Sequence, residues 1–109
     1  MSGPVDLCAL SDLPNGTHRA FAVEGRSILV FHIDGKFHAI DNRCSHLDFP
    51  LEGGRQIGCE IICRHHGARF DIRSGKALGG PAVDPVKVHH VTLRDGRVLL
   101  EVLAGRALT

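Results

Sequence analysis

Hydrophobic and polar residues alternate with a period of two along both ends of the chain, which is typical of β-strands buried on one face. On this pattern, strands are predicted at 19–23, 27–33, 36–40, 86–94 and 97–103. Successive strands are separated by Glu24-Gly25, Asp34-Gly35 and Asp95-Gly96, and such pairs suit tight hairpin turns. The pattern therefore predicts a meander of short antiparallel strands, followed late in the chain by a further hairpin.

The middle of the chain has a different pattern, in which glycine and proline interrupt every hydrophobic run. Only two short strands are predicted there, at 59–62 and 68–72, and residues 12–16 near the start indicate a turn or a single helical turn. We therefore expect one all-β domain over 1–109, with a basal sheet from about 1–41 and 86–109. An inserted lobe rich in loops is expected at about 42–85.

Composition and charge exclude several classes of function. The 109 residues include 13 Lys+Arg and 12 Asp+Glu, so the chain lacks the basic excess that binds nucleic acid or anionic membranes. The longest strongly apolar run, 28–31, is far too short to span a bilayer. Residues 1–6 carry no feature of a secretion signal. We expect a soluble cytoplasmic protein that binds neither nucleic acid nor membrane.

The candidate chemistry lies in two loops that each carry one cysteine and one histidine. Cys44-x-His46 is followed after sixteen residues by Cys63-x-x-His66. A single zinc ion more often takes its cysteines as a close pair, whereas a Rieske-type [2Fe–2S] cluster places two thiolates on one iron and two imidazoles on the other. The even split therefore favours these four side chains as ligands of one such cluster. Gly67 would let the backbone turn close to the cluster.

Two other uses of the cysteines remain open from the residues alone. The same four ligands could hold a structural zinc ion. Two disulfides could form among Cys8, Cys44, Cys59 and Cys63, although a reducing compartment disfavours them. If the cluster forms, Cys8 and Cys59 are expected to be buried, apolar strand residues.

The remaining histidines are predicted to have structural or surface roles. His65 lies outside the C-x-x-H spacing, so we expect it to be exposed or to contact a partner. The others fall on predicted strands, where surface or hydrogen-bonded histidines are the default: His18, His32, His38, His89 and His90. The last two are adjacent and should point to opposite faces of their strand.

The segment from Cys44 to Gly67 resembles the signature of Rieske iron–sulfur proteins, C-x-H followed by C-x-x-H-G. Residues 68–77 and 8–16 are also similar to the small Rieske ferredoxins of bacterial ring-hydroxylating oxygenase systems. The resemblance implies the all-β Rieske fold, in which an antiparallel basal β-sandwich carries a loop-rich cluster-binding lobe. It implies a one-electron carrier rather than an enzyme. It also implies a monomer whose partners are an NADH-dependent, FAD-containing ferredoxin reductase and a terminal aromatic ring-hydroxylating oxygenase.

The chain departs from the respiratory Rieske proteins, which the signature also resembles. Those relatives join their two loops by a disulfide at the positions that match Phe49 and His65, so no such bridge can form here. Their cluster sulfurs accept hydrogen bonds from hydroxyl groups at the positions that match Ala68 and Phe70. Because such donors stabilise the reduced state, we predict a potential toward the low end of the Rieske range of roughly −150 to +300 mV.

We expect the electron to leave at the outer edges of His46 and His66, because imidazoles at the tip of a lobe can lie near solvent. The residues around them are expected to form an apolar rim, with ordinary loop packing as the alternative. The predicted rim residues are Leu47, Phe49, Pro50 and Pro81. An oxygenase catalytic subunit is disfavoured, because its mononuclear iron site requires more chain. A small Rieske-like subunit of a larger, nitrite-reductase-type enzyme is the alternative function, although such subunits often lack some of the ligands.

Overall fold

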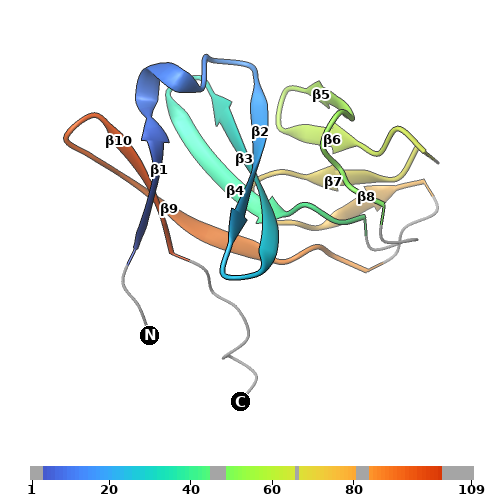
Figure 1. Ribbon diagram of the computed structural model, residues 1–109. Helices are drawn as coiled ribbons and strands as arrows, with labels where there is room; N and C mark the ends of the chain where they lie inside the picture. Colours follow the sequence, from blue (N-terminus) through green and yellow to red (C-terminus); the bar gives the residue numbers. More distant parts are fainter. Residues whose placement is uncertain (1–3, 45–48, 66, 81–83, 102–109) are drawn as a thin grey trace.

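The computed structural model describes residues 4–44, 49–65, 67–80 and 84–101. These residues form ten β-strands and one 3-10 turn, with no α-helix among them, which confirms the all-β prediction (Figure 1). The elements are β1 (Val5–Ala9), η1 (Leu10–Asp12), β2 (His18–Val23), β3 (Arg26–Ile33), β4 (Lys36–Asp41), β5 (Arg55–Ile57), β6 (Glu60–Ile62), β7 (Arg69–Asp71), β8 (Ala77–Gly79), β9 (Val88–Arg94) and β10 (Arg97–Glu101). No helix in the described part of the chain has the length and apolar character needed to cross a membrane.

The three predicted hairpins are confirmed. They connect β2 to β3, β3 to β4 and β9 to β10, all antiparallel. In each turn the first residue has positive φ, at 52° for Glu24, 49° for Asp34 and 50° for Asp95, and the glycine after it has positive φ as well. Two successive residues with positive φ define the type I′ turn, whose twist matches that of the strands it joins.

Six strands form one antiparallel sheet in the order β1-β10-β9-β4-β3-β2. Residues from both ends of the sheet meet in one hydrophobic cluster, called here the base core: Cys8, Leu13, Val23, Ile28, Val30, Ala39, Val98 and Leu100. The sheet must therefore bend over on itself. The expected basal sandwich is thus built from a single continuous sheet.

The second sheet is smaller and has the order β5-β6-β7-β8. It lies at the end of the molecule opposite β1 and β10 (Figure 1). All four of its strands fall between residues 55 and 79, and we propose residues 42–85 as the lobe that contains it. Its own cluster, called here the lobe core, comprises Leu29, Phe31, Ile40, Cys44, Leu51, Ile61, Cys63, Ala68, Phe70, Ile72 and Val86.

Strand β3 lies between the two cores and contributes residues to both. Ile28 and Val30 belong to the base core, while Leu29 and Phe31 belong to the lobe core. Successive strand residues point to opposite faces, so β3 is buried on both sides, and all four residues are 0% exposed. The apolar run at 28–31 is therefore a doubly covered strand, and the lobe rests directly on the basal sheet.

A histidine on β2 adds a polar connection between sheet and lobe. His18 Nδ1 lies 2.9 Å from Gln56 Oε1, and its Nε2 accepts a hydrogen bond from the Gly53 amide at 3.2 Å. This arrangement assigns the ring proton to Nδ1, since Nε2 acts as the acceptor. His18 thus has a structural role, as predicted, and it fixes the segment that follows the first candidate ligand loop.

Three local predictions need correction. The single helical turn lies at Leu10–Asp12, just before most of the segment predicted to form it. Cys59 is half-buried in the turn between β5 and β6 rather than in a strand, although Cys8 is buried in β1 as expected. Strands β5 and β8, of three residues each, were not predicted.

Candidate metal centre

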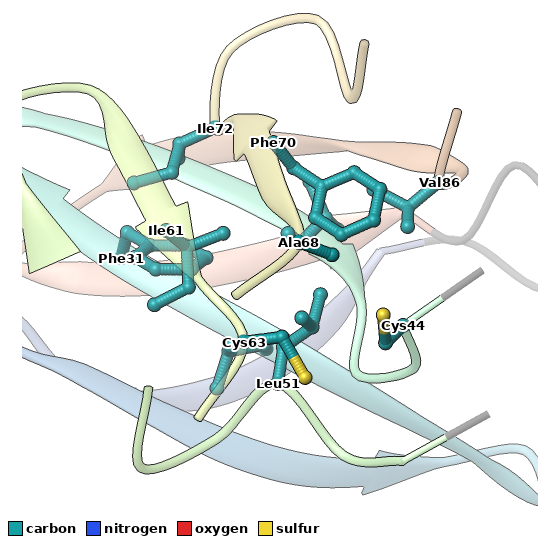
Figure 2. Packing of buried hydrophobic residues seen from close by; sticks show 11 residues of the cluster. Phe31, Cys44, Leu51, Ile61, Cys63, Ala68, Phe70, Ile72 and Val86 are labelled. Atoms are coloured by element: carbon teal, nitrogen blue, oxygen red, sulfur yellow. The ribbon is translucent and has the colours of Figure 1, made fainter. Parts of the chain in front are cut away.

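Cys44 and Cys63 come together in the lobe core. Cys44 follows the end of β4 and Cys63 directly follows β6. Each is 2% exposed, and they lie at the same edge of the core, around Leu51 (Figure 2). The other two predicted ligands, His46 and His66, lie outside the described residues. The structure thus brings together two cysteines that are separated by eighteen intervening positions in the sequence.

The two ligand loops are closed by the same backbone interaction. The Cys44 amide donates to the Phe49 carbonyl at 2.7 Å, and the Cys63 amide donates to the Ala68 carbonyl at 2.8 Å. In each loop the donor is the candidate ligand and the acceptor is five residues ahead. Equivalent closure of both loops is what a site needs if each loop is to present one cysteine and one histidine to the same cluster.

Glycines allow the backbone to turn and pack around the second loop. Gly67 has a φ of 77°, a value that disfavours residues with a side chain, and its amide donates to the Cys63 carbonyl at 3.0 Å. Gly80 lies against the same backbone, because a Cβ placed on it would be 2.5 Å from the Gly67 oxygen. The chain that leads to Pro81 therefore packs directly on the loop that carries Cys63.

The cysteine chemistry fits a thiolate-bound cluster. None of the four cysteines is joined in a disulfide, so the disulfide alternative is wrong. Cys44 and Cys63 are enclosed by apolar side chains of the lobe core, and such a shell limits the access of water to a metal centre. Among the described residues no group of three or more His, Cys, Asp or Glu side chains could hold a metal ion; two of the four predicted ligands are not among them.

Cys8 offers a contrast within the same chain. It lies in the base core, and burial, followed by the charge of Asp12, raises the pKa of its thiol. A raised pKa keeps a cysteine protonated and unreactive. Its interpretation as a small apolar residue is therefore confirmed.

An aromatic contact joins the two candidate ligand loops at Phe49 and His65, the positions where no disulfide can form. The rings of Phe49 and His65 stack with centroids 4.1 Å apart and an interplanar angle of 21°. Phe49 is 37% exposed, and His65 and Pro50 are exposed too. These three residues form an apolar and aromatic surface beside the candidate ligands. The other predicted rim residues, Leu47 and Pro81, lie outside the described residues.

The two positions expected to lack hydroxyl donors are deeply buried. Ala68 and Phe70 are each 0% exposed and pack in the lobe core with Cys63 (Figure 2). Neither side chain has a hydrogen to donate to sulfur. The surroundings of Cys63 are therefore apolar on this side, as the prediction of a low potential requires.

A hydrogen bond between Asp41, at the end of β4, and His89 joins β4 to β9. Asp41 Oδ1 is 2.7 Å from His89 Nε2, and Arg26 lies 3.6 Å from the other carboxylate oxygen. Burial acts to raise the pKa of Asp41, but the hydrogen bond and charge of His89, with the charge of Arg26, outweigh it and lower that pKa. His89 is buried and His90 exposed, which confirms that they point to opposite faces.

Sequence reasoning missed one residue of this region, Asn42. Its side-chain oxygen accepts hydrogen bonds from the amides of Leu51 and Glu52 at 2.9 and 2.8 Å. Its side-chain nitrogen donates to Ser27 Oγ at 3.0 Å. Asparagine commonly bonds to nearby backbone in this way, and its place two residues before Cys44 was the available signal.

Comparison with known proteins identifies what the chain is similar to. The model of the family described as "Rieske [2Fe-2S] domain" matches residues 3–90. The "3-phenylpropionate/cinnamic acid dioxygenase ferredoxin subunit" of Photorhabdus laumondii is 38% identical over 97 residues, which cover 88% of this chain and 91% of that protein.

Solved structures agree with the sequence comparison. The ferredoxin of carbazole 1,9a-dioxygenase from Nocardioides aromaticivorans IC177 has a TM-score of 0.89 and 33% identity, and the match covers 93% of this chain and 99% of that one. A second structure, a complex of reduced oxygenase and oxidised ferredoxin in carbazole 1,9a-dioxygenase, contains a chain with a TM-score of 0.85 and 28% identity. That match covers 89% of this chain and 91% of the other.

Proposed function

We propose, because this chain belongs to the Rieske [2Fe–2S] domain family, that it is a ferredoxin carrying single electrons to a terminal oxygenase that hydroxylates aromatic rings. The observation that carries the proposal is the pair of buried thiols, Cys44 and Cys63, presented by two loops with the same backbone closure. As an electron carrier it is not itself an enzyme.

Four side chains are proposed as the cluster ligands: Cys44, His46, Cys63 and His66. The bound cluster supplies a reversible one-electron couple. Cys44 and Cys63 would hold the cluster from the lobe core, where apolar neighbours such as Leu51 and Ala68 would exclude water. His46 and His66 would complete the set of ligands, and we propose them as the route by which the electron leaves.

The proposed partners follow from the names of the relatives. The Photorhabdus relative is the ferredoxin subunit of a dioxygenase, and a second similar chain belongs to a complex of reduced oxygenase and oxidised ferredoxin. We propose a terminal oxygenase as electron acceptor and an NADH-dependent, FAD-containing ferredoxin reductase as donor. The protein would work as a cytoplasmic monomer. These relatives favour the role of a free carrier over that of a small subunit in a larger reductase.

The proposed site is tested by changing one cysteine at a time. Cys44→Ser and Cys63→Ser should each abolish cluster assembly, because a lost thiolate leaves iron open to hydrolysis. The purified variants should lack the optical absorption and electron spin resonance signal of the cluster. Cys59→Ser is the matched control, since Cys59 is half-buried in a turn and should leave both signals unchanged. Normal signals from Cys44→Ser would refute the assignment.

A further inference from the structure

Asn42 joins three parts of the molecule through one side chain. Its amide nitrogen is anchored to Ser27 Oγ at the start of β3, and its amide oxygen receives the backbone amides of Leu51 and Glu52. The backbone amide of Asn42 also donates to the Ser27 carbonyl at 2.9 Å. The side chain is therefore held by the rigid sheet while it holds the far end of the first ligand loop.

The segment between these contacts is the loop that carries Cys44 and His46. It leaves the sheet at Asn42 and returns to the lobe core at Leu51, which is 0% exposed. Both ends of the loop thus meet at a single amide group. The Cys44 amide then closes the interior of the loop by donating to the Phe49 carbonyl.

Without Asn42 the loop would lose this constraint. The buried Leu51 amide would have no side-chain acceptor from Asn42, and a buried donor without a partner is costly. Local opening of the loop is the cheapest way to give that amide a water partner. Opening would move Cys44 relative to Cys63, which is held by its own hydrogen bonds after β6.

We propose that Asn42 is a positioning residue that holds Cys44 in place relative to Cys63 before the cluster is inserted. The role of Asn42 in cluster binding rests on the proposed function, whereas its role in holding the loop ends together does not. Asn42 does not touch the cluster in this proposal. It acts through the fixed distance between the two ends of the loop that carries Cys44.

Hydrogen exchange of the metal-free protein tests the structural claim directly. Asn42→Ala should speed exchange of the Leu51 and Glu52 amides by about tenfold, the effect of losing one net hydrogen bond. Asn42→Asp keeps an oxygen acceptor for both amides and should exchange almost as slowly as the parent. Ser27→Ala, an exposed and mild change, removes only the anchor and should give an intermediate rate.

Asn15→Ala is the matched control. Asn15 also accepts a backbone hydrogen bond, from Asp34 at 2.7 Å, but it does so at a hairpin of the basal sheet. Its removal should leave the Leu51 and Glu52 amides unchanged. If these two amides exchange at the same rate in the parent, in Asn42→Ala and in Ser27→Ala, the proposal is overturned.

The reconstituted protein supplies the second readout. In Asn42→Ala the cluster should lose iron to a chelator several times faster, and its spin resonance lines should broaden because the ligand loop samples more than one arrangement. Asn15→Ala should change neither property. Faster amide exchange together with unaltered iron release and spectra would show a structural role only and would also overturn the proposal. Failure of the ferredoxin function would instead appear as absence of a cluster in the parent protein.

Discussion

At the scale of single residues, Ala68 and Phe70 make the potential of the proposed cluster open to test. Both are wholly buried in the lobe core with Cys63, so a hydroxyl introduced there would be shielded from water. The double variant Ala68→Ser with Phe70→Tyr should raise the midpoint potential. If each new hydrogen bond stabilises the reduced state by about 1 kcal/mol more than the oxidised state, each hydroxyl raises the midpoint potential by roughly 40 mV.

A redox titration followed by optical absorption measures this shift. Phe21→Tyr is a suitable control, because Phe21 packs against the base core and a hydroxyl there should not change the potential. The parent protein should titrate toward the low end of the Rieske range. A parent midpoint well above about +100 mV, or no upward shift in the double variant, would contradict the role assigned to the missing hydroxyl groups.

The proposed ligand set could be read from the sequence because the spacing of Cys44, His46, Cys63 and His66 is itself the chemical signal. The contacts that support this set could not be predicted from sequence. The stack of Phe49 on His65 joins side chains from different loops, and no periodicity links them. The Asn42 side chain accepts hydrogen bonds from the backbone amides of residues nine and ten positions away. Such contacts depend on the tertiary fold and not on a local sequence pattern.

At the scale of elements, the junction of β4 and β9 is the narrowest part of the six-stranded sheet. Its ladder has two aligned pairs, Ala39 with His89 and Ile40 with Val88, and the contact of Asp41 with His89 reinforces it. Because the pKa of Asp41 is lowered in the folded state, its ionised form stabilises the fold. That contribution is complete above the unfolded pKa of about 3.9 and is lost as the pH falls through the folded value.

Asp41→Asn should therefore reduce the free energy of unfolding at pH 7 by about 1 kcal/mol, the difference between a charged and a neutral hydrogen bond. The difference from the parent should shrink below about pH 4 as the parent carboxylate is protonated. Urea unfolding followed by circular dichroism at several pH values measures this. Asp95→Asn removes the same charge from an exposed turn and should change little. A deficit in Asp41→Asn that stays constant with pH would argue against a stabilising role for the Asp41 carboxylate.

Elements were predictable where local signals and tertiary structure agree. The turns at Glu24-Gly25, Asp34-Gly35 and Asp95-Gly96 fix hairpins through their own backbone preferences. Strand β1 pairs with β10 from the other end of the chain, and no local pattern indicates that partner. The bending of one sheet into a sandwich likewise depends on contacts between distant strands.

At the scale of the whole molecule, charge is divided unevenly although the net charge is only +1. The proposed lobe, residues 42–85, holds six Lys+Arg and five Asp+Glu, and the rest of the chain holds seven of each. The thiolates of Cys44 and Cys63 would balance an oxidised cluster core, so the lobe would keep a formal charge of +1 until one electron lowers it to zero. A small positive lobe suits a partner whose docking surface is acidic.

The position of a charged residue on the surface should therefore affect the rate of electron transfer to the oxygenase more than the net charge of the protein does. Arg64 is exposed beside Cys63, whereas Arg94 is exposed at the distant hairpin of β9 and β10. Arg64→Glu and Arg94→Glu have the same net charge, yet only Arg64→Glu should slow bimolecular transfer, by two- to threefold for an exposed pair of about 0.5 kcal/mol. Stopped-flow kinetics should show this difference at low salt and lose most of it above about 0.15 M salt, where charges are screened beyond roughly 8 Å. Equal slowing by both variants, with unchanged optical spectra, would mean that net charge rather than the lobe directs the encounter.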